Sequence, residues 1–297
     1  MNIYDCFMYF DEDMLLDLRL NVLDKYVKKF IITEATYTHS GQEKKLNFDI
    51  KNFSKFKDKI EYIIVDQLPP NLLSLNDFDN ENEKNKKKIL NGYARDNFQR
   101  EKLNEGLKDL DQNDLIFVSD LDEIPNLKSI NFSKIFNKII IFKQEMFYYK
   151  LNLRYKDFIW YGTKACKKKD FISPQWLRDI KSKKYSNLRL DLLFSKKKYS
   201  DVHFINNGGW HFTCIRTPEN LRYKLLNFAH HQDFEQSGLK TDDLRNLIKK
   251  KKPMYDHAAD KKNQNKWNTE KKLEQISLKK IPQYIEDNPD KFEKWLD

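Results

Sequence analysis

A short apolar run, Leu115 to Val118, passes directly into an acidic segment that contains Asp120, Asp122 and Glu123. Four consecutive apolar residues are typical of a strand that is buried on both faces. Because side chains alternate along an extended chain, we expect Asp120 and Asp122 to point in the same direction. Pro125 lacks an N–H group and should end the hydrogen-bonded ladder. The sequence therefore predicts two carboxylates at the carboxyl end of a buried strand, which is where open α/β sheets bind their ligands.

The segments around this strand alternate between strand-like and helix-like patterns over the first 150 residues. Short apolar runs predict strands at 3–10, 30–34, 60–65, 115–118, 139–142 and 147–149, and helical spacing predicts helices at 16–27 and 89–110. This alternation predicts an α/β fold with a mixed, mostly parallel sheet and helices on both faces. We expect one domain over 1–250 and a polar, partly helical C-terminal extension over 251–297 that packs on the same domain.

Composition limits the choice of partner and compartment. The formal net charge of +10 favours an anionic partner, such as a nucleotide, a phosphorylated lipid or an acidic glycan, although a Lys-rich codon bias is an alternative explanation. Three isolated cysteines, Cys6, Cys166 and Cys214, indicate neither a disulfide framework nor a zinc site. The sequence has neither an apolar run of the roughly 18–20 residues that span a membrane nor a signal-peptide pattern at its start. We therefore expect a cytoplasmic protein.

The acidic pair predicts a metal site. Paired carboxylate oxygens bind Mg²⁺ or Mn²⁺ against a substrate phosphate, whereas the alternative is a polar turn that caps a strand. A second segment, Gly208 to His211, places an indole and an imidazole beside flexible backbone. Trp210 is a candidate for stacking on a sugar ring, and His211 is a candidate third metal ligand. A structural role is the alternative for both.

Further cofactor contacts are predicted near the other strand ends. Glu34 closes a predicted strand and is a candidate acceptor for a ribose hydroxyl, and His39 lies in the loop that follows. Arg95 and Arg100 lie on the helix before the acidic strand, where either could clamp a diphosphate or pair with the nearby carboxylates. An ordinary solvated loop and surface salt bridges are the alternatives.

Six segments carry a resemblance to a known family: Tyr4–Phe7, Phe30–Ala35, Thr38–Gly41, Arg95–Arg100, Ser119–Pro125 and Gly209–Phe212. In this order, over about residues 3–235, they resemble glycosyltransferase family 17. The resemblance implies a GT-A fold, a nucleotide-sugar donor, a divalent cation and inversion at the anomeric carbon. It places Asp120 and Asp122 in the metal-binding pair and favours His211 as a ligand. Eukaryotic members carry an N-terminal membrane anchor that this chain lacks, so we do not expect it to modify N-glycans.

The expected reaction is therefore metal-dependent transfer of a sugar, with GlcNAc as a candidate, from a donor of the UDP type. The expected acceptor is a saccharide or lipid-linked saccharide of a surface glycan. A carboxylate should remove the proton of the attacking hydroxyl, and the candidate bases are Glu145, Asp179 and Glu219, each with a plain surface charge as the alternative. Lysine clusters predict peripheral contact with anionic lipid at the inner membrane face.

Two other classes compete with this interpretation. Haloacid-dehalogenase-type phosphatases also place Asp-x-Asp after an apolar strand, with the first Asp as nucleophile. Their motif continues with a small hydroxyl pair, whereas Glu123-Ile124-Pro125 follows here. A non-catalytic anion-binding protein could instead use the lysine runs at 86–88, 167–169 and 249–252. We expect no nucleic-acid partner.

Overall fold

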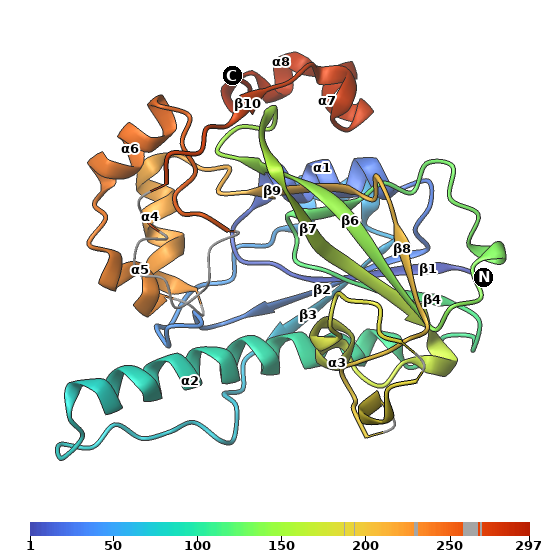
Figure 1. Ribbon diagram of the computed structural model, residues 1–297, viewed down its shortest axis with the longest axis horizontal. Coiled ribbons are helices and arrows are strands. Elements are labelled where there is room, and N and C mark those ends of the chain that lie inside the picture. The colour runs from blue at the N-terminus through green and yellow to red at the C-terminus, as the bar shows by residue number, and fades with distance from the viewer. Residues whose placement is uncertain (187, 193, 229–230, 258–266, 268) are drawn as a thin grey trace.

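The strand before the acidic segment lies in the middle of a large sheet. The computed structural model describes residues 1–186, 188–192, 194–228, 231–257, 267 and 269–297. Within these residues, one ten-stranded sheet has the order β3-β2-β1-β4-β7-β6-β9-β5, with β10 paired to β7 and β8 paired to β6 (Figure 1). The strands are β1 (Ile3–Met8), β2 (Lys29–Ala35), β3 (Ile60–Val65), β4 (Leu115–Val118), β5 (Glu123–Pro125), β6 (Ile139–Tyr148), β7 (Leu153–Lys167), β8 (Val202–Ile205), β9 (Gly209–Thr213) and β10 (Glu274–Gln275).

The sheet is mixed, as predicted. All pairs among β1 to β4 are parallel, whereas the second part combines parallel pairs of β6 with β8 and β9 with antiparallel pairs. Strand β1 runs parallel to β2 and β4, and β2 runs parallel to β3. Strand β7 is antiparallel to both β4 and β6. The short connection 149–152 explains why β6 and β7 are antiparallel, because a parallel crossover needs a dozen or more residues whereas a hairpin does not. The expectation of a mostly parallel sheet thus describes β1 to β4 and not the second half.

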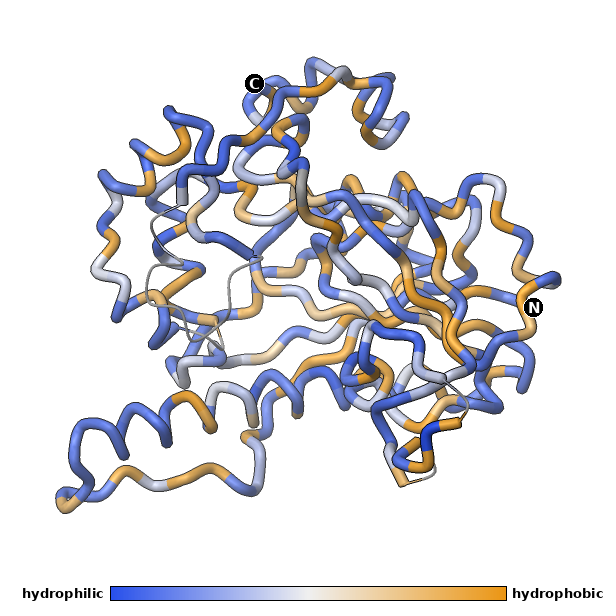
Figure 2. Tube along the Cα trace, in the orientation of Figure 1, coloured by the Kyte–Doolittle hydropathy of each residue, from blue (hydrophilic) through white to orange (hydrophobic). Residues whose placement is uncertain are grey.

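The helices cover both faces of the sheet, as expected. They are α1 (Asp13–Leu23), α2 (Glu81–Glu101), α3 (Pro174–Asp179), α4 (Pro218–Asn227), α5 (His231–Ser237), α6 (Thr241–Lys249), α7 (Gln283–Asp287) and α8 (Pro289–Phe292). Phe7 and Phe30 pack with the leucines of α1 in one core cluster. Cys6 and Ile31, their neighbours on the strands, pack with Leu107 and α3 in another. Alternating strand residues therefore point to two separate cores. Figure 2 shows apolar positions on both strands and helices.

Helix α2 begins eight residues before the predicted start at 89. Asn80 caps it with a capping box, in which Asn80 Oδ1 accepts from the Glu83 N–H and the Glu83 carboxylate accepts from the Asn80 N–H. This cap satisfies free N–H groups, so a polar segment without an apolar stripe can begin a helix. The helix extends away from the sheet (Figure 1).

The C-terminal segment is partly helical, as expected, although 258–266 and 268 lie outside the described residues. Ile285 of α7 and Phe292 of α8 are fully buried and join the same core cluster as α1. Strand β10 adds to the edge of β7. The division into 1–250 and 251–297 stays a prediction.

Candidate active site

A cavity of about 620 Å³ opens over the carboxyl ends of the parallel strands. The lining residues come from the ends of three parallel strands. Met8 ends β1 and Tyr9 and Phe10 follow it, Ala35 ends β2 and Tyr37 follows it, and Asp120 to Asp122 follow β4. Side chains from β6, β7, β9, α4 and α5 form the opposite wall. The predicted acidic pair thus lies at the ligand-binding edge that an α/β sheet provides. We call this hollow the main cavity.

A buried arginine shapes the acidic segment. Arg19 of α1 is fully buried and donates to both carboxylate oxygens of Asp5, at 2.6 and 2.7 Å. It also donates to the backbone carbonyls of Asp120, Leu121 and Glu123 at 2.8–3.2 Å. One guanidinium therefore ties α1, β1 and the turn after β4 together, which fixes the backbone that presents the acidic pair.

Asp120 lies between two arginines. Its carboxylate accepts from Arg178 Nη2 at 2.7 Å and from Arg100 Nη2 at 3.3 Å, and 41% of the side chain is exposed. Burial would raise the pKa of Asp120, but the charges of Arg178 and Arg100 outweigh it and hold that pKa well below its usual range. Asp120 is therefore ionised at neutral pH and has one face open to a ligand.

Glu123 positions the nearer of these arginines. It is fully buried, and its two oxygens accept from Arg178 Nη1 and Nη2 at 2.7 and 2.6 Å. Trp160 Nε1 and the Asp120 N–H also donate to it, at 2.6 and 3.0 Å. The third acid of the motif thus orients Arg178 and Trp160 toward the cavity. Sequence reasoning missed both partners, since neither stands near the acidic motif in the chain.

Asp122 faces the imidazole of His211. The antiparallel pairing of β5 with β9 sets His211 opposite Glu123, and His211 Nε2 lies 3.6 Å from Asp122 Oδ1. The imidazole stacks on Trp160 with ring centroids 4.7 Å apart. Its Nδ1 is buried and has no hydrogen-bond partner among the described residues. The structure thus brings together Asp120, Asp122 and His211, the three predicted metal ligands, at the wall of the main cavity.

A lysine completes the cationic rim. Lys224 Nζ lies 3.0 Å from Glu12 Oε1 and 4.0 Å from Asp122 Oδ2. Burial would lower the pKa of Lys224, but the carboxylates of Glu12 and Asp122 reverse the effect and raise it. The ammonium therefore stays charged beside Asp122. No sequence pattern around Lys224 signals this role, because its partners lie two hundred and one hundred residues away in the chain.

The other predicted cofactor residues divide into three groups. Arg100 and His39 line the main cavity. Arg95 lines a neighbouring pocket instead, while Glu34 and Trp210 line neither.

Glu34 and Trp210 have structural contacts. The fully buried Glu34 carboxylate accepts from the N–H groups of Asn47 and Phe48 and from the Tyr62 hydroxyl, at 2.8–3.1 Å. Glu34 therefore holds the segment around Asn47 and Phe48 against β2. Trp210 packs against the core cluster around α1, and its Nε1 donates to the Lys280 carbonyl at 3.0 Å. The position of Glu34 does not suit the predicted ribose contact, and Trp160 rather than Trp210 offers a ring to the cavity.

The three candidate bases lie outside the cavity lining. Glu145 accepts from Arg154 at 2.7 Å, Asp179 lies 2.6 Å from Lys197 Nζ, and Glu219 accepts from Arg245 at 2.6 Å. A general base must come within hydrogen-bond reach of its proton. Their positions therefore favour none of the three over the carboxylates that do line the cavity.

A divalent cation would have two carboxylates here rather than a cage. The described part of the chain contains no cluster of three or more His, Cys, Asp or Glu side chains that could hold a metal ion. Mg²⁺ commonly takes one or two carboxylates and completes its shell with waters and substrate phosphates. The Asp122 carboxylate accepts no hydrogen bond from any described residue, so its oxygens are available for such a role. The residues present fit a cation that is shared with a phosphate-bearing ligand.

Two carboxylates, flanking cations and an indole that stacks on an imidazole line this part of the main cavity. The model of glycosyltransferase family 17 matches residues 1–297, and the chain belongs to this family. The family resemblance inferred from the ordered motifs is thereby confirmed.

Curated relatives are distant and longer. The chain is 22% identical over 255 residues to the human beta-1,4-mannosyl-glycoprotein 4-beta-N-acetylglucosaminyltransferase and 23% identical to its rat counterpart. In both cases the match covers 75% of this chain and 42% of the relative, so the chain spans less than half the length of these proteins. The solved structure of HddC from Yersinia pseudotuberculosis matches 70% of this chain and 91% of its own at 13% identity, with a TM-score of 0.32, which is too low to indicate a shared fold.

Proposed function

We propose that this chain is a metal-dependent, inverting glycosyltransferase that moves a sugar, with GlcNAc as the first candidate, from a UDP-linked donor to a saccharide acceptor. The observation that carries the proposal is the pair Asp120 and Asp122 at the edge of the main cavity, at the carboxyl ends of parallel strands. The family supports sugar transfer, and the names of the mammalian relatives support GlcNAc. A GT-A-like arrangement of the N-terminal sheet is part of the same proposal.

The divalent cation, Mn²⁺ or Mg²⁺, would be held by Asp120 and Asp122, with waters and the donor phosphates rather than the predicted third ligand His211 completing its shell. When bound, it would stabilise negative charge on the diphosphate of the donor. Arg100 and Arg178 would add fixed positive charge at the same place, because the half-buried Asp96 holds the Arg100 guanidinium and the buried Glu123 holds that of Arg178. His39 lies beside Arg100 on the wall of the main cavity, where it could contact the donor.

Sugar transfer exchanges one bond at the anomeric carbon for another. The acceptor oxygen forms a bond to this carbon from the face opposite the diphosphate, and the bond from the carbon to the diphosphate oxygen breaks with its electron pair. The hydroxyl proton goes to a carboxylate, and the carboxylates that line the cavity away from the acidic pair are Glu12, Asp96, Asp233 and Asp256. We look for the base in this group, because Glu145, Asp179 and Glu219 lie elsewhere.

The acceptor and the location remain proposals. No described helix is long and apolar enough to cross a membrane. The net charge of +10 favours work beside anionic material, so we propose a precursor saccharide of a surface glycan, free or lipid-linked, as acceptor. A cytoplasmic enzyme in peripheral contact with the inner membrane face would have access to it.

The test is turnover of UDP-GlcNAc with and without metal. UDP release should require Mn²⁺ or Mg²⁺ and stop in EDTA, and Asp122→Asn should lower the rate by at least about 100-fold, as for loss of a charge-stabilising group. Asp242→Asn is the matched control, since Asp242 is an exposed carboxylate on α6 that lines neither the main cavity nor the neighbouring pocket.

Full activity in EDTA would refute the metal assignment. Absence of UDP binding together with hydrolysis of a generic phosphomonoester would instead support the phosphatase class. Salt-sensitive binding of polyanions without turnover would support the non-catalytic class.

A further inference from the structure

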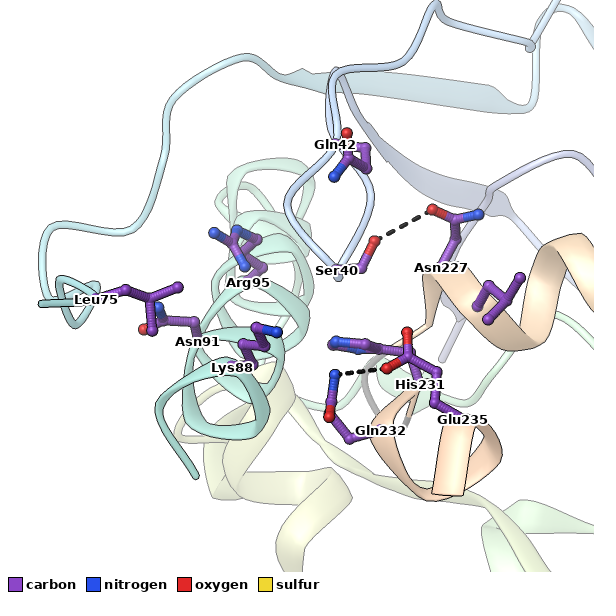
Figure 3. Close-up of a pocket in the computed structure, with 11 residues that line it drawn as sticks. Ser40, Gln42, Leu75, Lys88, Asn91, Arg95, Asn227, His231, Gln232 and Glu235 are labelled. Atoms are coloured by element: carbon purple, nitrogen blue, oxygen red, sulfur yellow. Dashed lines mark hydrogen bonds between the residues drawn. The ribbon is translucent and has the colours of Figure 1, made fainter. Parts of the chain in front are cut away.

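A second hollow has a volume of about 400 Å³ (Figure 3). The loop around Ser40, one face of α2, the end of α4 and the described residues of α5 line it. Asn227 lines both hollows, and His39 of the main cavity is the chain neighbour of Ser40. We call this hollow the side pocket. A ligand that extends out of the main cavity could therefore reach it.

The side pocket contains an arginine without a counter-charge. Arg95 Nη1 donates to the His39 carbonyl at 3.2 Å, which uses one of the five N–H groups of its guanidinium. Its Nε is buried and has no partner within the described residues, and no carboxylate of that part of the chain forms an ion pair with it. Burial lowers the pKa of Arg95, so the cation is partly desolvated. A desolvated, unpaired guanidinium favours the binding of an anion from outside.

The surrounding chain holds this guanidinium in place. Gly41 has a φ of +101°, and a Cβ there would lie 2.8 Å from Arg95 Nη2, so the loop packs directly against the guanidinium and only glycine fits. The Asn91 carboxamide, one turn earlier on α2, bonds the backbone N–H and C=O of Leu73 at 2.7 and 2.8 Å. The Arg95 guanidinium and the Asn91 carboxamide are therefore held in place within this wall.

The remaining lining groups also suit an oxyanion. Lys88 lies seven residues before Arg95, on the same face of α2, and forms no ion pair with a described residue. Ser40 Oγ donates to Asn227 Oδ1 at 3.1 Å, and neutral amides and hydroxyls make up most of the polar lining. Among the described residues of the lining, Glu235 is the one carboxylate, and it accepts from Gln232 at 2.9 Å. Two cations against one anion give the described lining of the side pocket a formal charge of +1.

We infer that the side pocket binds an oxyanion group of the acceptor, a phosphate or a carboxylate carried by the saccharide. The word acceptor rests on the proposed function, whereas the anion specificity rests on Arg95 and Lys88 alone. The donor diphosphate belongs to the main cavity, because Asp120, Arg100 and Arg178 do not line the side pocket. An acidic acceptor would thus be held at one end while its hydroxyl faces the donor sugar.

The experiment measures binding of inorganic phosphate by titration calorimetry at constant ionic strength. Arg95→Gln should weaken phosphate binding at least about tenfold, as expected for loss of a charge-assisted hydrogen bond. Lys88→Gln should weaken it less, and Glu235→Gln should strengthen it, because a like charge is removed. Lys86→Gln is the matched control: Lys86 is exposed on the same helix, lines neither hollow, and carries the same charge.

The outcomes separate the possibilities. Equal phosphate affinity in wild type, Arg95→Gln and Lys88→Gln, or no binding by wild type at millimolar phosphate, would overturn the inference. If Arg95→Gln does not fold, the comparison of Lys88→Gln with Lys86→Gln, both at exposed positions, tests the inference. Weaker phosphate binding in Lys88→Gln than in Lys86→Gln would support it, and equal affinities would overturn it. UDP binding should be the same in wild type and Arg95→Gln. Failure of wild type to bind UDP would count against the proposed function, while the phosphate result would still decide the ligand class of the side pocket.

The source of the oxyanion is resolved with three sugars. Glucose 6-phosphate and glucuronate are compared with glucose, and at least one of the anionic sugars should bind more tightly than glucose. Arg95→Gln should remove that difference. Equal affinities of wild type for all three sugars would overturn the proposal that the anion is carried by a saccharide.

Discussion

Replacement of Arg178 by methionine tests the charge network that supports the acidic pair. Arg178 has only 15% of its side chain exposed, and it makes two hydrogen bonds to the fully buried Glu123 and one to Asp120. Methionine keeps much of the volume but leaves the Glu123 charge buried with Trp160 Nε1 and one backbone N–H as its donors. Breaking a buried ion pair from one side costs about 3–5 kcal/mol of unfolding free energy. We expect Arg178→Met to lose an amount in that range.

The assay is urea denaturation at pH 7, followed by far-UV circular dichroism. Glu123→Gln in the Arg178→Met background should recover part of the loss, because the uncompensated charge is then gone, and the coupling between the two sites should reach about 1–3 kcal/mol. Arg245→Met is the control, since Arg245 is more than half exposed and its pairs should contribute no more than about 1 kcal/mol. A loss below about 1 kcal/mol in Arg178→Met, or a double variant no more stable than the single one, would refute this account of the network.

The same substitution has a pH signature. Arg178 lowers the pKa of Asp120 in the folded chain, so its contribution is present above the unfolded pKa and is lost as pH falls through the folded pKa. The stability difference between wild type and Arg178→Met should therefore shrink below about pH 4. Because Asp120 is 41% exposed, solvent screening keeps this part of the effect small. A difference that grows on acidification would contradict the sign.

Three further predictions concern other parts of the molecule. Trp160→Ala should weaken UDP-GlcNAc binding in calorimetry, whereas Trp210→Ala should lower stability with little effect on binding, because Trp160 lines the main cavity and Trp210 does not. The reverse pattern would restore Trp210 as the stacking ring. Lys164 donates to the Arg178 carbonyl at 2.6 Å, and burial lowers the pKa of Lys164 to about 7. Above about pH 7 the unfolded chain binds a proton at Lys164 that the folded chain does not. The free energy of unfolding should therefore rise between about pH 7 and 8.5 by up to about 1.4 kcal/mol per pH unit. The same dependence of this free energy on pH in Lys164→Met would contradict the prediction. In liposome flotation, the protein should bind anionic but not neutral vesicles, and this binding should be lost at about 0.5 M salt. Absence of binding at low salt would contradict the proposed contact with the membrane surface.

Local patterns in the sequence were sufficient to place the acidic pair. The apolar run 115–118 and the residues after it form β4 and the cavity edge, because a buried strand and the polar turn at its end depend mainly on neighbouring residues. The alternation of strands and helices likewise predicted the parallel order of β1 to β4 and helices on both faces. The antiparallel pairing of β6 with β7 as a hairpin was not predicted. The apolar patterns of these two strands are compatible with parallel or antiparallel pairing.

The partners of the acidic pair were decided by tertiary structure alone. Arg19, Arg178 and Lys224 reach the segment from three helices, and His211 reaches it through the pairing of β9 with β5. Sequence spacing carries no information about which distant cation faces which carboxylate, because that depends on how the elements pack. For the same reason Glu34 and Trp210, which stand in suggestive positions along the chain, point into packed structure rather than into the main cavity. The sequence determined which chemistry is available, and packing determined which of those groups meet.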